Sequence, residues 1–123
     1  MIHTLYILDE GGNPVPVDVA DPNAVDWGKW RYTHHKQCVI ALDRVRDASA
    51  VQHYVISTVF TGINAGNDPP LLWETVILHA GDGEYQPYAS YASRVDAEVG
   101  HQRALAYYRD QLTQTQTTKP EDS

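Results

Sequence analysis

The chain has 123 residues, of which 42% are hydrophobic and 20% are charged, a composition typical of one globular domain and not of a disordered or fibrous chain. Sixteen acidic residues against nine basic ones give a net charge of -7, which argues against duplex nucleic acid as a partner because such binding depends on neutralising phosphates. The chain has a single cysteine, its start lacks a signal-peptide pattern, and it contains no run of about 18 apolar residues. These features predict a cytoplasmic protein without membrane contact.

The first 31 residues predict a hairpin followed by a short helix. Apolar residues 5–8 and 15–19 flank the turn sequence Asp-Glu-Gly-Gly-Asn, which is typical of a hairpin with a short loop. Asp21-Pro22 then supplies a helix cap and a first-turn proline, so we expect a helix over residues 23–31.

The middle of the chain predicts four further strands and one irregular loop. Alternating apolar residues indicate strands over 37–45, 53–60 and 71–79, and the β-branched density of 53–60 favours a strand most strongly. Residues 61–70 contain two glycines and two prolines, which predicts a loop that is neither helix nor regular strand. Residues 85–91 are expected to form a short edge strand or an extended segment.

The last predicted element is a helix from about Ser93 to Leu112, which begins with a Ser93-Arg-Val-Asp96 capping box. Its apolar stripe consists of Ala97, His101, Ala104, Leu105, Tyr108 and Leu112. We therefore predict an α+β fold, with an antiparallel sheet of four to five strands and the C-terminal helix packed on one face. Residues 1–112 would form this single domain, and the polar residues 113–123 a mobile tail.

Glu74 is a candidate functional residue because alternation places its carboxylate on the same face as the apolar residues around it. If Phe60 lies near Leu71, Ser57 falls opposite Glu74; a register shifted by one brings Thr58 there instead. Either arrangement gives the carboxylate a hydroxyl partner.

His101 lies in the middle of the helical stripe and is the candidate to meet Glu74. Two interpretations are open: a pair for proton transfer or polar-ligand binding, and a buried hydrogen bond that sets how helix and sheet dock. Ser57 would be the nucleophile of such a site, but no strand-turn-helix elbow surrounds it.

No cofactor or metal is predicted. The histidines lack the spacings of zinc motifs, although a site assembled from His79, Glu74 and His101 is an open alternative. The glycines occur without the lysine and helix start that phosphate loops need.

Tyr85, Tyr88 and Tyr91 are spaced by three and are followed by a Tyr107-Tyr108 pair. Such tyrosines are typical of a protein interface, and they equally suit the capping of a sheet edge. A platform that stacks a base or nucleotide ring is favoured less, because few lysines and arginines are interleaved. Exposed aromatic residues also favour self-association, so a homo-oligomer is among the expected states.

Several segments together resemble a family of small uncharacterised accessory proteins of tailed phages and prophages. The matching segments are Leu8-Asp-Glu-Gly-Gly-Asn-Pro, Trp27 and Trp30, Ile56-Ser-Thr-Val-Phe-Thr-Gly-Ile-Asn64, Pro69-Pro-Leu-Leu-Trp-Glu-Thr75 and Ala97-Glu-Val-Gly-His101. The resemblance implies a phage context, hence the cytoplasm of a bacterial host, and a strand-loop-strand-helix core. It implies no activity.

The leading functional hypothesis is a phage accessory protein that binds, without catalysis, a host protein or a small nucleotide-like signalling molecule in counter-defence or host takeover. The candidate contact residues are Asn64, Asn67, Asp68, Trp73, Glu74, Tyr85, Tyr88, Tyr91 and His101. One alternative is a small hydrolase or phosphodiesterase-like enzyme that uses Glu74 and His101, with Ser57. Another is a minor virion or assembly component.

Overall fold

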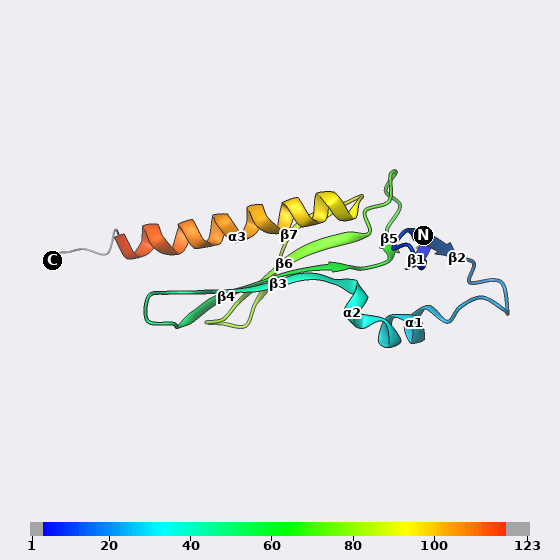
Figure 1. Cartoon of the computed structure of the whole chain (residues 1–123), viewed down its shortest axis with the longest axis horizontal. Coiled ribbons are helices and arrows are strands. Elements are labelled where there is room, and N and C mark those ends of the chain that lie inside the picture. Colours follow the sequence, from blue (N-terminus) through cyan, green and yellow to red (C-terminus); the bar gives the residue numbers. More distant parts are fainter. Residues whose placement is uncertain (1–3, 118–123) are drawn as a thin grey trace.

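A computed structural model describes residues 4–117, which form two antiparallel sheets and three helices (Figure 1). The strands are β1 (Thr4–Leu8), β2 (Pro14–Val17), β3 (Val39–Arg46), β4 (Gln52–Phe60), β5 (Ile63–Asn64), β6 (Trp73–His79) and β7 (Tyr85–Tyr91). The helices are α1 (Trp27–Thr33), α2 (His35–Cys38) and α3 (Arg94–Thr117).

The larger sheet has four strands in the order β3-β4-β6-β7, and α3 lies along one of its faces (Figure 1). The predicted α+β fold, with a C-terminal helix on an antiparallel sheet, is therefore confirmed. Edge strand β7 was also expected. Its register shifts between Thr75 and Val76 of β6, where Tyr88 is left without a partner.

The predicted N-terminal hairpin is present, but β1 and β2 belong to a separate three-stranded sheet with β5. The prediction that residues 61–70 contain no strand was wrong, because Ile63 and Asn64 form β5. The chain leaves β4 and turns at Gly62, whose φ is 70° and whose carbonyl accepts a 2.7 Å hydrogen bond from Tyr6 N. A side chain at Gly62 would overlap the Tyr6 carbonyl, so only glycine lets the two backbones approach and β5 pair with β1.

Helix α1 begins at Trp27 and not at residue 23, because Asp26 provides its cap: the Asp26 carboxylate accepts from Lys29 N at 3.1 Å. Asp21 instead accepts from Asn23 N, two residues on, which is a local turn. Residues 35–38 form α2, so the strand predicted over 37–45 begins two residues late, at Val39. Arg31 anchors α1 to the end of β4, since its guanidinium donates to the carbonyls of Phe60 and Thr61 at 2.6 and 3.0 Å.

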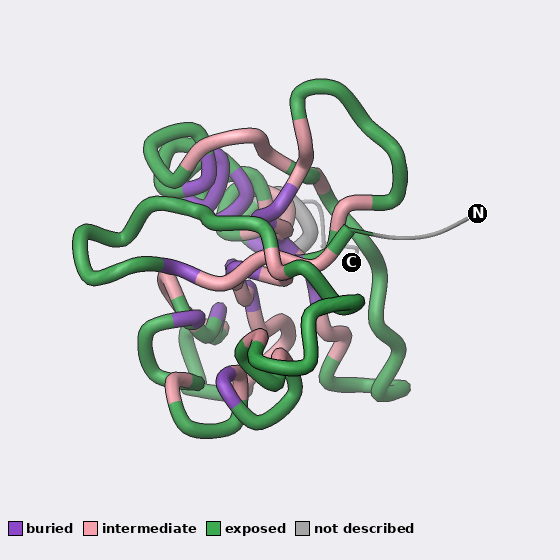
Figure 2. The backbone as a smooth tube through the Cα atoms, turned by 90° about the vertical axis from the view of Figure 1, so that its right-hand side faces the viewer, coloured by how far each residue is buried: buried purple, intermediate pink, exposed green. Residues whose placement is uncertain are grey.

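Helix α3 confirms the predicted stripe, since five of its six residues are buried and Tyr108 is half-buried. Ser93 accepts from Asp96 N at 3.1 Å, as a cap residue does. The helix continues to Thr117, five residues past the predicted end, and the remainder of the predicted tail, 118–123, lies outside the described residues. Figure 2 shows buried segments in the interior, with exposed loops around them; besides those between α3 and the sheet, Trp30 of α1 and Cys38 of α2 are buried.

The other face of the four-stranded sheet carries none of the described helices along most of its length (Figure 1). Trp73, Thr75 and Ile77 of β6 are buried under α3, so the alternate residues Glu74, Val76 and Leu78 point the other way. We call this second surface the open face. Its residues, by register, are Val39, Leu42, Arg44, Val55, Ser57, Val59, Glu74, Val76, Leu78, Tyr85, Pro87 and Ser90.

The turn between β3 and β4 depends on Asp47. Its carboxylate accepts from Ser49 N, Val51 N and His53 Nε2 at 2.8, 3.0 and 3.0 Å. The hydrogen bond from His53, followed by the one from Val51, holds the pKa of Asp47 below its ordinary value of 3.8.

A carboxyl with a lowered pKa in the folded state stabilises the protein above its unfolded pKa, and this contribution is lost as the pH falls through the folded pKa. We therefore expect the Tm of the wild type to fall below about pH 3.8 partly through Asp47, and Asp47→Asn to lack this part of the decrease. Thermal unfolding of both proteins across the acid range measures the difference. Two parallel curves would contradict the assignment.

Candidate functional site

A chain of hydrogen bonds crosses the sheet beneath α3. His101 bonds through Nε2 to Asp43 Oδ2 at 2.7 Å and through Nδ1 to Thr58 Oγ1 at 2.8 Å. The Thr58 hydroxyl contacts the Thr75 hydroxyl, which accepts from Tyr91 at 3.0 Å. The network thus joins α3 to all four strands of the sheet.

The network has a consistent direction. In a neutral imidazole one ring nitrogen donates and the other accepts; since a carboxylate only accepts, Nε2 donates to Asp43 and Nδ1 accepts from Thr58. Thr75 then donates to Thr58, and Tyr91 donates to Thr75. Each hydroxyl and ring N–H has a partner, as buried polar groups require.

An acid, a histidine and a hydroxyl in series resemble the arrangement of a nucleophilic triad. Here, however, Thr58, Thr75 and His101 are fully buried, and the hydroxyl of Thr58 is enclosed between helix and sheet. Of these residues, Asp43 reaches the surface, with 39% of its side chain exposed. The geometry therefore supports the interpretation in which His101 sets the docking of α3, with Asp43 and Thr58 as its partners.

Gly100 makes room for the end of this network. A Cβ at this position would overlap the Tyr91 ring, whose hydroxyl bonds to Thr75. Two consecutive residues thus serve the same network: His101 forms hydrogen bonds with its imidazole, and Gly100 leaves the space that the Tyr91 ring needs.

The expected meeting of Glu74 and His101 was wrong, because they lie on opposite faces of the sheet. The register pairs Phe60 with Trp73 and not with Leu71, so Glu74 lies opposite Val59 on one side and Ser90 on the other. Ser57 lies opposite Val76. Alternation correctly grouped Glu74 with Val76, but α3 covers the other face, so the apolar surroundings of Glu74 are those of the open face.

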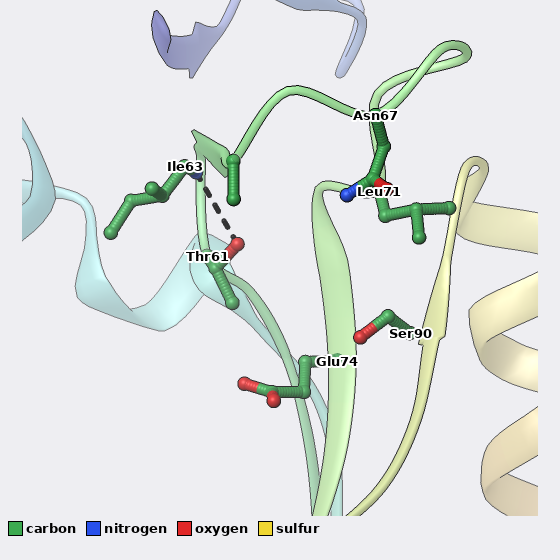
Figure 3. A pocket seen from close by; sticks show the side chains of 7 residues that line it. Thr61, Ile63, Asn67, Leu71, Glu74 and Ser90 are labelled. Carbon is green, nitrogen blue, oxygen red and sulfur yellow. Dashed lines mark hydrogen bonds between the residues drawn. The ribbon is translucent and has the colours of Figure 1, made fainter. Parts of the chain in front are cut away.

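Glu74 lies in a hollow of about 260 Å³ at the end of the open face (Figure 3). The polar lining comes from Thr61, Asn67, Glu74 and Ser90, and the apolar lining from Ile63, Ala65 and Leu71. No hydrogen bond or ion pair joins the Glu74 side chain to another described residue. The hollow thus presents an unpaired carboxylate beside aliphatic side chains, which suits a cationic group with an apolar stem.

The loop residues predicted to make contacts have different environments. Asn64 Oδ1 accepts from Gly66 N and Asn67 N at 3.2 and 2.9 Å, so the Asn64 side chain shapes the loop, while Asn67 lines the hollow. Asp68 is exposed. Trp73, in contrast, is buried in the core against Phe60 and is not accessible to a partner.

The three tyrosines of β7 do not form one surface. Tyr85 is exposed and belongs to the open face, since it pairs with Leu78. Tyr91 is half-buried over Gly100. Tyr88 lies on the α3 side, 6.4 Å from the ring of Tyr108.

Tyr88 belongs instead to an aromatic cluster at the seam between α3 and the sheet. The cluster, which we call the aromatic seam, consists of Tyr54, His79, Tyr88, Tyr107 and Tyr108, with ring centroids 4.7 to 6.4 Å apart. Tyr88 and Tyr107 are 40% and 51% exposed. The spacing of three in the sequence signalled Tyr88, whereas Tyr54 and His79, which come from two other strands, carried no such signal.

Burial raises the pKa of the Tyr108 phenol above its ordinary value of 10.0, and the phenols of Tyr107, Tyr54 and Tyr88 raise it further. The centre of the aromatic seam is therefore an uncharged phenol at neutral pH.

Within residues 4–117, no three histidine, cysteine or carboxylate side chains are grouped so as to hold a metal ion. No helix of this part of the chain has both the length and the apolar character needed to cross a bilayer. Compared with protein-family models, curated proteins and solved structures, the chain matches none.

Thr58→Val keeps the shape of the buried side chain but removes the donor to His101 and the acceptor of Thr75. We expect a loss of about 1 to 3 kcal/mol in the free energy of unfolding, measured with urea, because two buried polar groups lose their partner. Thr33→Val, at an exposed threonine, is the control and should change stability by less than about 0.5 kcal/mol. Equal losses in both variants would exclude this role of the network.

Gly100→Ala should destabilise the protein by about 1 to 3 kcal/mol, because the new methyl group displaces Tyr91. Helix propensity alone would give the opposite sign, a gain of about 1 kcal/mol. Gly28→Ala in α1 is the matched control, since a Cβ there meets the Asp26 carboxylate at an ordinary 3.7 Å. Denaturant unfolding that shows Gly100→Ala to be stabilising would mean that Tyr91 does not pack on Gly100.

Proposed function

We propose that the protein is a phage-encoded accessory protein that acts without catalysis, by binding a host protein through the aromatic seam. The observation that carries this proposal is the cluster of four tyrosines and one histidine from four elements, with Tyr88 and Tyr107 exposed at its surface.

Tyrosine rings in such a cluster provide a large contact area at a low cost in conformational entropy, and tyrosine is enriched among the residues that dominate binding energies. The rings of Tyr88 and Tyr107 both rest against Tyr108, so they are held in place before a partner arrives. Their hydroxyls form no hydrogen bond with another described residue and remain available to a partner.

A protein partner suits this surface better than a nucleotide-like ligand. The ring contacts of the aromatic seam involve tyrosine and histidine but no lysine or arginine, and the chain carries a net charge of -7. A phosphate would therefore meet little positive charge. The resemblance of several segments to phage accessory proteins supports a host protein as the target, in counter-defence or host takeover.

The alternative enzyme, with Glu74 and His101 as acid and base, has no geometric support because the sheet separates the two side chains. The unpaired carboxylate of Glu74 instead belongs to a separate surface.

The test is a pull-down from bacterial lysate with the wild-type chain and with Tyr88→Ala/Tyr107→Ala. We expect one specific host protein to bind the wild type and the double variant to bind it at least about tenfold more weakly, measured as Kd on the purified partner. Tyr32→Ala is the matched control, because Tyr32 is 83% exposed on α1, outside the seam. A partner that binds all three proteins equally would refute the aromatic seam as the binding surface.

A further inference from the structure

The open face of the four-stranded sheet is a second surface that no described helix covers along most of its length, and it is mainly apolar. Its apolar residues are Val39, Leu42, Val55, Val59, Val76, Leu78, Tyr85 and Pro87. Val39 and Leu42 are 43% and 45% exposed. An antiparallel sheet that faces water on one side is expected to carry polar residues there, so this pattern indicates a covered surface.

Two residues of the open face are charged, and they have opposite signs: Arg44 on β3 and Glu74 on β6. Neither forms an ion pair with another described residue. An interface between two identical chains related by a two-fold axis is self-complementary. If one residue of the first copy contacts a different residue of the second, the same contact occurs a second time with the two copies exchanged. We propose that a second copy of this chain covers the open face, with Arg44 of each copy paired with Glu74 of the other.

The register sets where the two-fold axis must pass. Arg44 lies beside Val55 of β4, Glu74 lies beside Val59 of β4, and Ser57 is midway between them on that strand. Strands β3 and β6 flank β4 on its two sides. The midpoint between the two charges is therefore Ser57.

This placement also determines how the sheets cross. With strands about 4.8 Å apart and alternate residues about 6.8 Å apart, the two charges are separated by roughly 17 Å along a diagonal of the sheet. A two-fold axis that exchanges the charges makes the strands of the copies cross at roughly 70°, close to the orthogonal class of sheet packing. Ser57 is small, so the two sheets can approach closely at the axis.

The hollow at Glu74 gives the partner's arginine a place to bind. Figure 3 shows the Glu74 carboxylate turned toward the side of Thr61 and away from the Ser90 hydroxyl, with Ile63 and Leu71 on opposite sides of the opening. The guanidinium of the second copy's Arg44 would donate to Glu74, and its methylene stem would contact the aliphatic side chains. In the proposed dimer, the hollow of each copy is thus the binding site for Arg44 of the other copy.

Charge reversal tests the pairing on the full chain by sedimentation equilibrium. The wild type should be a dimer, and Arg44→Glu or Glu74→Arg should each weaken dimerisation by at least about a hundredfold, because either change turns both intersubunit pairs into like charges. The double variant Arg44→Glu/Glu74→Arg should restore the dimer. Arg103→Glu, an exposed position on α3, is the control and should leave it unchanged.

Cross-linking tests the position of the axis. Ser57→Cys should give an intermolecular cross-link in high yield with a short bis-maleimide, because the two introduced thiols face each other at the axis, across sheets that pack about 10 Å apart, which is too far for a direct disulfide. The native Cys38 is buried and should not react, and Ser49→Cys, in the exposed turn between β3 and β4, should cross-link poorly. A monomeric wild type would overturn the proposal, as would a dimer that ignores the charge variants or one that Ser57→Cys fails to cross-link.

Discussion

The fold depends on His101, whose imidazole lies fully buried between α3 and the sheet and bonds in two directions. One nitrogen reaches Asp43 on β3 and the other reaches Thr58 on β4, which contacts Thr75 on β6. Apolar contacts of the α3 stripe tolerate small shifts of the helix, whereas a hydrogen bond weakens steeply with distance and angle. These bonds therefore select one rotation and one height of α3 over the sheet. Gly100 extends this control to β7, because it admits Tyr91 beside the helix.

Placing α3 on one face leaves the other face of the sheet without a cover, and the two proposed binding surfaces follow from this asymmetry. The aromatic seam forms where the second half of α3 meets β4, β6 and β7, so it exists only when the helix is docked. The open face lies on the reverse side and ends at the hollow of Glu74. A dimer through the open face would carry two aromatic seams on its outer surfaces, and a target with two equivalent sites would then bind more tightly through avidity.

Two of the edge strands, β2 and β7, carry features that disfavour association with another chain through strand pairing. Strand β2 carries Pro14 and Pro16, and β7 carries Pro87 beside an irregularity in its register. Prolines and bulges at edge strands remove donors and disturb the ladder, which protects against pairing with another chain.

Much of the fold was predictable from local patterns. Period-2 alternation located β4 and β6, and helical spacing identified the stripe that α3 buries against the sheet, although not Gly100, which packs on Tyr91. Local patterns failed at β5, which forms because Tyr6 bonds to Gly62, a contact distant in sequence, and at the start of α1, where the local cap is Asp26, which accepts from Lys29 N, and not Asp21. The candidate site was predictable only in part, because Glu74 and His101 were singled out correctly as unusual polar residues but assigned to one another.

The sequence by itself determined the long strands, the hairpin and the C-terminal helix, and the grouping of their residues into faces, since both follow from the periodicity of each segment. Only the tertiary structure decided which face α3 covers. Both faces of β4 are compatible with burial: Ile56, Thr58 and Phe60 point one way, and Val55, Ser57 and Val59 point the other. The choice rests on the hydrogen bonds of His101 with Thr58 and Asp43. Thr58 is 43 positions before His101 in the sequence and Asp43 is 58 positions before it, so no local pattern contains that information.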